Sequence, residues 1–422
     1  MSKLRKNATY MITGQLATVF FQGVQFFLVA RALGPEEFGR VAGMLAITAA
    51  LLPFSGVGAG NVMVMRLARR DGEPQVYFGN ALVVVLVSGI LLTLLALLIN
   101  ATLLRGVASW ENMLLFALSE IMMTKLIDIA VHVFYGLDRH EFSGFFYALQ
   151  SAFRMLLSAS LFLFPHPTAW HWGCLHLAAG AAAMLVVVIM TIRQVGLPKP
   201  NIHLALKELK VGVFFSIGLS SKSLYTDIDK AVLARFASPE ICGAYTAAFR
   251  LIFIAYTPIR AILQASMARF FRAGTNGVTG PVQFANKIVF WAALYAITFA
   301  ICVYVAAPMV RLLLGDAYTM SVSILQSLAL VPLVLVLQDV YSDALTGAGR
   351  QGLRSIFQVI VAILCFCSNM VLVPMYSWAG SVTSTYLSQA LLAVLIIGCI
   401  VVLSRRSSPA SDATSLSPER GS

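Results

Sequence analysis

Long apolar runs alternate with short polar segments along almost the whole chain. Twelve runs are mostly apolar over about twenty residues, the length that an α-helix needs to cross the hydrocarbon core of a membrane. They lie at about 9–31, 41–65, 77–100, 112–136, 142–164, 169–192, 211–236, 243–266, 285–310, 321–346, 353–374 and 379–403. The pattern predicts an all-α polytopic membrane protein with about twelve transmembrane helices.

Composition leaves little room for anything else. Of the 422 residues, 59% are hydrophobic and 11% are charged, whereas about 25% of the residues in a soluble domain are charged. The longest segments outside the predicted helices are a linker at 193–210 and a tail from Ser404 that is rich in Ser and Pro, so no soluble catalytic domain fits. No clear cleavage site follows the first apolar run, and we expect that run to remain as an anchor.

The basic residues are shared unevenly between alternate loops. If the N-terminus is inside, nineteen Lys and Arg residues lie in cytoplasmic segments and only five lie in outer loops. The outer five are Arg31, Arg40, Arg105, Arg235 and Arg311. This is the positive-inside pattern of a multi-pass membrane protein, and it predicts that both termini are cytoplasmic. It also accounts for most of the net charge of +12 without a nucleic-acid partner.

One phrase occurs twice, as VARALGPEEFGR at 29–40 and as LARFASPEICGA at 233–244. Five pairs of identical residues are each separated by 204 positions: Ala30 and Ala234, Arg31 and Arg235, Pro35 and Pro239, Glu36 and Glu240, Gly39 and Gly243. Each copy also has the pattern of a helix start, with Gly34 or Ser238 at the cap and a proline after it.

The two copies indicate an internal duplication. Six predicted spans separate them, and an even number leaves both halves in the same orientation, so we expect parallel repeats about an axis along the membrane normal. The predicted domains are an N-terminal six-helix bundle at 1–192, a cytoplasmic linker at 193–210, a C-terminal six-helix bundle at 211–403 and a disordered cytoplasmic tail at 404–422.

Three stretches carry a family resemblance. They are ARALGPEEFGRVAGMLAI at 30–47, APMVRLLLGDAY at 307–318 and GAGRQGLRSIFQVIVAILCFCSNMVLVPMYSWAGSVTST at 347–385. In these stretches, and nearly end to end, the chain resembles the polysaccharide-biosynthesis flippases of the multidrug/oligosaccharidyl-lipid/polysaccharide exporter superfamily.

The resemblance implies two six-helix bundles around a central cavity. It implies a flippase, not an enzyme, that moves a polyprenyl-pyrophosphate-linked oligosaccharide from the inner to the outer leaflet of the bacterial cytoplasmic membrane, for O-antigen or exopolysaccharide synthesis. The partners that follow are the lipid-linked substrate, the surrounding membrane lipids and a polysaccharide polymerase or export machinery. We expect a monomer that needs no cofactor.

The seventh span, VGVFFSIGLSSKSLYTDIDKAVLARF, carries ionisable groups where each costs about 2.5–3.5 kcal/mol near the membrane centre. On a helix, Lys222, Thr226, Asp227, Asp229 and Lys230 share one arc, which predicts a water-filled cavity beside it. Lys222 has no acidic neighbour on its own helix. Two readings follow: Lys222 binds the substrate phosphate, or it pairs with an acid from another span, such as Asp128 or Asp339.

Three further groups of residues are candidates for the same site. The 204-residue offset places Gln22 and Gln25 of the first span opposite the charged arc, where they bind sugar hydroxyls or join helices. Arg250 and Arg260 in the eighth span either meet phosphate or extend to the two membrane surfaces. Candidates for ion coupling are Asp227, Asp229 and Asp128; the last can instead be neutralised by Lys125 and His132 on its own helix. No metal site is predicted.

Two other functions compete with the flippase. One is an ion-coupled exporter of drugs or other small amphiphiles. The other is a membrane glycan polymerase or ligase, which the short outer loops disfavour. The chain has no glycine-lysine loop for nucleotide phosphates, so ATP hydrolysis within the chain does not drive transport.

Overall fold

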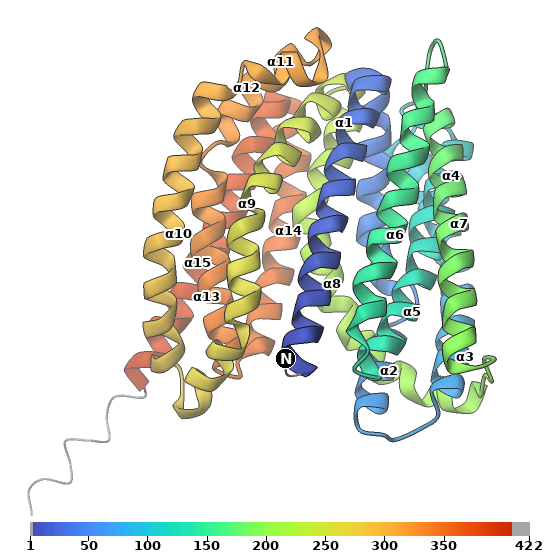
Figure 1. Ribbon diagram of the computed structural model, residues 1–422. Coiled ribbons are helices and arrows are strands. Elements are labelled where there is room, and N and C mark those ends of the chain that lie inside the picture. Colours follow the sequence, from blue (N-terminus) through green and yellow to red (C-terminus); the bar gives the residue numbers. More distant parts are fainter. Residues whose placement is uncertain (1–2, 407–422) are drawn as a thin grey trace, which may run out of the picture. The chain divides into compact units, whose positions relative to one another are not determined.

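The computed structural model describes residues 3–406, which form helices and turns but no strand (Figure 1). Side chains are described there except at 3–9, 210–211, 214–215, 217–222, 224, 268, 276 and 405–406. The α-helices are α1 (Lys3–Leu51), α2 (Ala59–Ala68), α3 (Pro74–Leu103), α4 (Trp110–Ala117), α5 (Lys125–Gly136), α6 (His140–Ala159), α7 (Ala169–Val195), α8 (Ile202–Phe236), α9 (Pro239–Ala273), α10 (Thr279–Ala306), α11 (Met309–Leu314), α12 (Thr319–Leu328), α13 (Val331–Gly347), α14 (Gln351–Tyr376) and α15 (Trp378–Arg406). Short 3₁₀ turns are η1 (Leu52–Phe54), η3 (Ser160–Leu163), η4 (Gly274–Asn276) and η5 (Asp316–Tyr318), and a π-helix is η2 (Leu118–Thr124).

The chain divides into two compact units. Unit 1 comprises Met1–Ala248, Pro308–Ile324 and Phe366–Ser381, and unit 2 comprises Phe249–Ala307, Leu325–Cys365 and Val382–Ser422. In unit 1, α1 packs along α6 and α8. These units follow spatial contacts rather than the sequence repeat, and the domain boundaries at 192 and 211 remain a prediction.

Eight of the described helices are long and apolar enough to cross a membrane, and the pair α12 and α13, bent by 49°, is a ninth candidate. Helical residues overlie each of the twelve predicted spans. Two spans are interrupted in ways that the apolar pattern did not predict. The predicted linker is also shorter than expected, because α8 begins at Ile202.

The first interruption lies at 52–58, within the second predicted span, where Gly56 has φ of 75°. Polar groups in this interruption bond to neighbouring helices. Ser55 Oγ donates to the carbonyl of Ile121 at 2.8 Å, and the backbone N–H of Gly56 donates to Ser88 Oγ at 2.8 Å. Backbone groups in an apolar environment need such partners, so the break depends on α3 and η2.

The π-helix η2 interrupts the fourth predicted span. π-turns are rare and occur frequently at functional sites. Here the turn carries Glu120 and Thr124, whose side chains bond to residues of α6 and α7. Ser119 Oγ of the same turn donates to the carbonyl of His176 at 3.2 Å.

The repeated phrase forms a helix start in both copies. The helical path of α1 breaks at Gly34 (φ 72°), directly before Pro35. At the second copy, Ser238 Oγ accepts from the backbone N–H of Ile241 at 3.1 Å, and α9 begins at Pro239. The predicted caps are therefore confirmed.

The two copies contact each other through equivalent residues. A Cβ on Gly39 would overlap the carbonyl oxygen of Pro239, and a Cβ on Gly243 would overlap the carbonyl oxygen of Pro35. The backbones can approach this closely because both glycines lack a side chain. The contact is reciprocal, as expected of two copies related by an approximate twofold axis.

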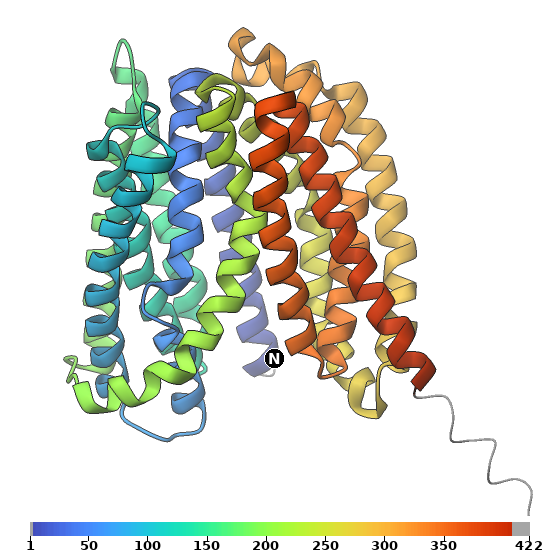
Figure 2. The same ribbon diagram turned by 180° about the vertical axis from the view of Figure 1, so that it is seen from behind.

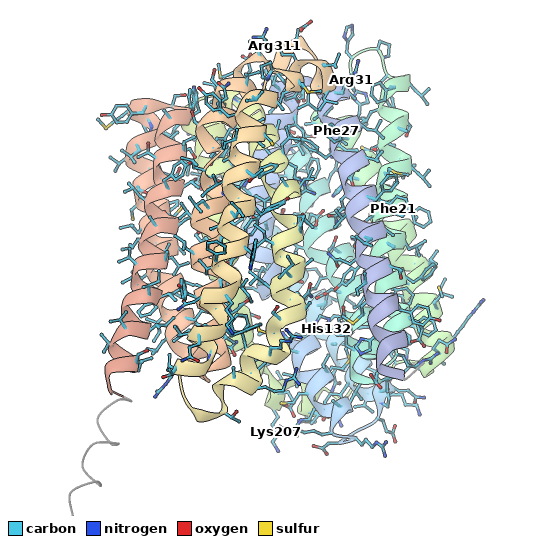
Figure 3. All side chains as sticks on the ribbon, turned by 60° about the vertical axis from the view of Figure 1, so that its left-hand side comes forward. Phe21, Phe27, Arg31, His132, Lys207 and Arg311 are labelled. Carbon is cyan, nitrogen blue, oxygen red and sulfur yellow. The ribbon has the colours of Figure 1, made fainter. Side chains whose placement is uncertain are left out.

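Figure 3 separates the two ends of unit 1. Arg31 and Arg311 lie at one end and Lys207 at the other, with His132 nearer to Lys207. In Figure 1, α1 starts at the end where Lys207 lies. The sides to which the charge pattern assigns these residues are thus opposite ends of one unit.

Candidate functional site

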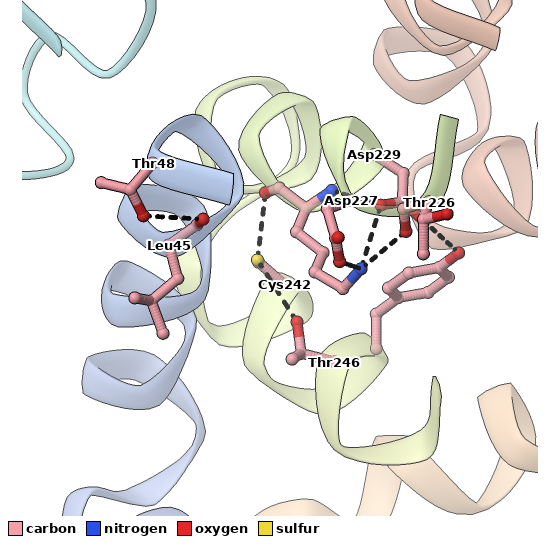
Figure 4. A network of polar contacts seen from close by, with 9 residues as sticks. Leu45, Thr48, Thr226, Asp227, Asp229, Cys242 and Thr246 are labelled. Carbon is pink, nitrogen blue, oxygen red and sulfur yellow. Dashed lines mark hydrogen bonds and ion pairs between the residues drawn. The ribbon is translucent and has the colours of Figure 1, made fainter. Parts of the chain in front are cut away.

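A cluster of charged side chains joins α8 to α9 in unit 1 (Figure 4). Lys230 Nζ lies 2.7 Å from Asp227 Oδ1 and 3.5 Å from Asp229 Oδ1. The ammonium also donates to the backbone carbonyl of Thr226 at 3.0 Å. Lys230 and Asp229 are buried, whereas the Asp227 side chain is 33% exposed. Two carboxylates around one ammonium leave the cluster with a net charge of −1 when both are ionised.

Both carboxylate oxygens of Asp229 have hydrogen-bond partners. Tyr245 Oη donates to Asp229 Oδ2 at 2.7 Å, and the backbone N–H of Lys230 donates to Oδ1 at 2.8 Å. Cys242 Sγ closes the same region by donating to the carbonyl of Lys230 at 3.1 Å. A buried charge requires such pairing. The expectation that Asp229 lies on a wet face is not met, and Asp227 is the more accessible acid.

A second cluster surrounds Asp128 on α5. Lys125 Nζ donates to Asp128 Oδ2 at 2.9 Å, and Tyr147 Oη of α6 donates to Oδ1 at 2.7 Å. His132 Nδ1 lies 2.7 Å from the backbone carbonyl of Asp128. A carbonyl only accepts, so Nδ1 carries the hydrogen in this contact. Of the two readings for Asp128, these contacts favour neutralisation within its own helix, with Tyr147 added from α6.

A third cluster, centred on Glu120, was not predicted from the sequence. Glu120 Oε1 lies 2.8 Å from Arg154 Nη2 of α6 and 2.6 Å from His176 Nε2 of α7. Thr124 Oγ1 accepts from Arg154 and from Gln150, each at 2.9 Å. One signal was available: Tyr147, Gln150 and Arg154 form a polar stripe at helical spacing on α6. The partners of this stripe lie on other helices, so the sequence of α6 alone does not identify them.

The other predicted site residues are placed as follows. On α1, Gln22 is exposed and Gln25 is half-buried. Thr226 on α8 is half-buried, and Arg250 and Arg260 on α9 are exposed in unit 2. Lys222 is on α8, but its side chain lies outside the described residues. The structure thus joins Asp227 to Asp229 and keeps Asp128 in a separate cluster.

The acids of unit 2 have partners of their own. Tyr256 Oη donates to Asp339 Oδ2 at 3.0 Å, and Arg354 Nη1 lies 3.1 Å from Asp343 Oδ1. Arg354 also donates to Thr346 Oγ1 at 2.9 Å. The like-charged pair on α13, which had no assignment from the sequence, is therefore divided between two different neighbours.

No group of three or more metal-ligating side chains is found among the residues with described side chains. The clusters around Asp229, Asp128 and Glu120 pair acids with cations and hydroxyl groups inside unit 1. Among the candidate residues with described side chains, Gln22, Arg250 and Arg260 are exposed, whereas Gln25, Thr226, Asp227 and Asp128 are half-buried.

Comparison with known proteins identifies the family to which this sequence is similar. A sequence profile of a family described as polysaccharide biosynthesis protein matches residues 4–272, more than half of the chain. A putative O-antigen transporter from Shigella dysenteriae is 25% identical over 206 residues, which cover 47% of this chain and 50% of the relative. That match therefore spans about half the length of the relative.

Solved structures share the fold. An inward-facing multidrug resistance MATE family transporter of the MOP superfamily has a TM-score of 0.74 at 16% identity, covering 93% of this chain and 96% of the other. The lipid II flippase MurJ in its inward closed conformation has a TM-score of 0.74 at 13% identity, covering 94% and 90%. At these identities the likeness shows the fold alone.

Proposed function

This chain belongs to the polysaccharide biosynthesis protein family, and on that basis we propose that it is a flippase for a lipid-linked oligosaccharide. The substrate is an oligosaccharide on a polyprenyl pyrophosphate, moved across the bacterial cytoplasmic membrane during synthesis of a surface polysaccharide. O-antigen and exopolysaccharide are the two classes of product. Both termini lie in the cytoplasm, and the protein is a transporter rather than an enzyme.

The family match over residues 4–272 is the observation that carries this proposal. The fold does not separate the alternatives, because a multidrug transporter and a lipid II flippase have the same TM-score to this chain. The similarity to a putative O-antigen transporter supports the flippase over a drug exporter.

The candidate residues suit an amphipathic anion. Arginine presents paired donors that match phosphate oxygens, and Arg250 and Arg260 are exposed on α9. Lys222 on α8 adds a cation for the pyrophosphate in this proposal. Gln22 and Gln25 on α1, together with Thr226, offer amide and hydroxyl groups to sugar hydroxyls.

Transport by the purified protein tests the proposal. The protein is placed in liposomes with lipid-linked oligosaccharide extracted from a strain that lacks it, and the sugar that becomes accessible to an added glycosidase is measured. We expect translocation with the natural protein, a near-complete loss with Lys222→Ala and Lys222→Glu, and partial activity with Lys222→Arg. Arg235→Ala, an exposed basic residue at the end of the same helix, is the matched control.

The outcomes distinguish the competing functions. Movement of a cationic dye without movement of the lipid-linked sugar would identify a drug exporter. Unimpaired translocation by Lys222→Ala would exclude the phosphate role of that residue. Poor folding of Lys222→Ala, repaired by Asp128→Asn or Asp339→Asn, would show that Lys222 is part of an ion pair.

A further inference from the structure

The segment at 197–209, between α7 and the later turns of α8, is fixed to unit 1 through backbone contacts. The backbone N–H of Lys199 donates to the carbonyl of Gln75 at 3.0 Å, and the N–H of Asn201 donates to Asn80 Oδ1 at 2.6 Å. Gln75 also donates to the carbonyl of Val195 at 3.0 Å. The connection between the two predicted halves is therefore held against α3.

One face of this segment continues that attachment. Asn201 caps α8 by accepting from the backbone N–H of Leu204 at 3.1 Å. Glu208 Oε1 lies 2.6 Å from Arg66 Nη2, and Asp71 Oδ2 lies 2.8 Å from Arg66 Nη1. The Glu208 and Asp71 carboxylates raise the pKa of Arg66 further above its ordinary value. The inner face is occupied by unit 1.

A second face is apolar and open. Leu197 is 71% exposed, Ile202 is 63% exposed and Leu206 is 60% exposed. Ile202 and Leu206 are four residues apart, so they stand one above the other on the helix. Each of these three side chains is therefore more than half exposed. Exposing this apolar row to water would oppose the hydrophobic effect.

A third face is basic and lies directly beside the apolar row. His203 and Lys207 each follow one residue after Ile202 and Leu206, so they form a parallel row about 100° further round the helix. Both are exposed, as is Lys199. A helix with a buried side, an apolar side and a basic side is typical of a segment that lies in the boundary between lipid chains and head groups.

The position of the segment agrees with such a boundary. Figure 2 shows the first turns of α8 running across one end of unit 1 before the helix turns along the bundle. Figure 3 places Lys207 at that end, opposite Arg31. The charge pattern predicts that this end is cytoplasmic, and the cytoplasmic leaflet carries a negative surface potential that attracts lysine.

We infer that residues 197–209 form an interfacial anchor that binds the cytoplasmic leaflet: Leu197, Ile202 and Leu206 enter the lipid chains, and Lys199 and Lys207 bind anionic phospholipid head groups. The partner is the lipid surface itself. Since α8 is helical from Ile202 to Phe236, the anchor and the cluster at Asp227 belong to one helix.

A matched pair of labels tests the depth of the anchor. Leu206→Cys and Lys207→Cys are made in the full chain with its six cysteines replaced, labelled with an environment-sensitive dye and reconstituted in liposomes. We expect the dye at 206 to be quenched by a lipid-borne quencher and shielded from iodide, and the dye at 207 to show the reverse. Equal iodide access at both positions, in a protein that retains its helical content, would overturn the anchor.

Lipid composition tests the head-group contact. Thermal unfolding is compared in nanodiscs of phosphatidylcholine alone and of phosphatidylcholine with phosphatidylglycerol. We expect phosphatidylglycerol to stabilise the natural protein, and Lys199→Gln with Lys207→Gln to remove this gain, because each lysine strengthens binding to an anionic leaflet about fivefold. The control is Arg105→Gln, an exposed residue of a loop predicted to be external. An undiminished gain in the double lysine variant, or an equal loss in the Arg105 variant, would overturn the head-group contact.

Discussion

One buried and one half-buried carboxylate in unit 1 are each bonded to a tyrosine hydroxyl group. Tyr245 bonds to Asp229, and Tyr147 bonds to Asp128, each at 2.7 Å. A phenol supplies one strong donor and adds no charge. These tyrosines therefore complete the coordination of carboxylates that a single lysine satisfies only in part.

Removal of one such hydroxyl should destabilise the protein. We expect Tyr245→Phe to lower the free energy of unfolding by about 1–3 kcal/mol, since it leaves a buried carboxylate oxygen without its donor. Thermal unfolding in detergent measures the effect. Tyr304→Phe is the control, because the Tyr304 side chain is exposed. Equal unfolding temperatures for the two variants would contradict this account of Asp229.

The accessible acid of the α8 cluster is the better candidate for ion coupling. Asp227 is 33% exposed, whereas Asp229 is enclosed by Tyr245 and Lys230. We expect Asp227→Asn to fold normally and to reduce the dependence of transport on pH or sodium. We expect the main effect of Asp229→Asn to be a lower free energy of unfolding. Transport measured over a range of pH and sodium concentration is the check. If Asp227→Asn leaves both dependences unchanged, coupling lies elsewhere or is absent.

Among the elements, α1 and α9 contact each other at Gly39 and Gly243, where each helix has a glycine. We expect Gly39→Ala and Gly243→Ala each to cost about 1–3 kcal/mol, because the added methyl group would overlap a carbonyl oxygen of the other copy. Gly23→Ala is the matched control, since no heavy atom outside its own helix lies within 4 Å of the new Cβ. That variant should be neutral or more stable by about 0.5–1 kcal/mol, because alanine favours a helix. A Gly39→Ala protein as stable as Gly23→Ala would refute the close contact.

The elements also show which features of the fold the sequence predicts and which it does not. Apolar length predicted the helices, and the repeated phrase predicted the caps at Gly34 and Ser238, because both depend on residues that are neighbours in the chain. The side chains of Glu120 and Thr124 in the π-turn at 118–124 bond to α6 and α7, which are distant in the sequence. The Glu120 cluster was missed for the same reason. Family membership, the all-α fold and the polytopic class are confirmed, whereas the substrate-binding residues remain proposals.

For the whole molecule, the charge pattern predicts one orientation in the membrane. We expect Asn201→Cys to react with a membrane-impermeant reagent only after cells are opened, and a cysteine at Arg105 to react in intact cells. Mass-tag labelling of a protein without its native cysteines measures both. Labelling of Asn201→Cys from outside would reverse the orientation and would place the 197–209 anchor in the outer leaflet.

The reciprocal contact at Gly39 and Gly243 also bears on the origin of the chain. Gly39 contacts Pro239, and the equivalent Gly243 contacts the equivalent Pro35. Such a reciprocal pair of contacts is the geometry of an isologous interface in a symmetric homodimer. A separate half-length ancestor with this phrase would have paired with a second copy of itself at the same surface. Gene fusion would then have preserved an existing interface. Since that fusion, Gly39 and Gly243 would each have had to remain glycine, because the backbone of the other copy lies against them.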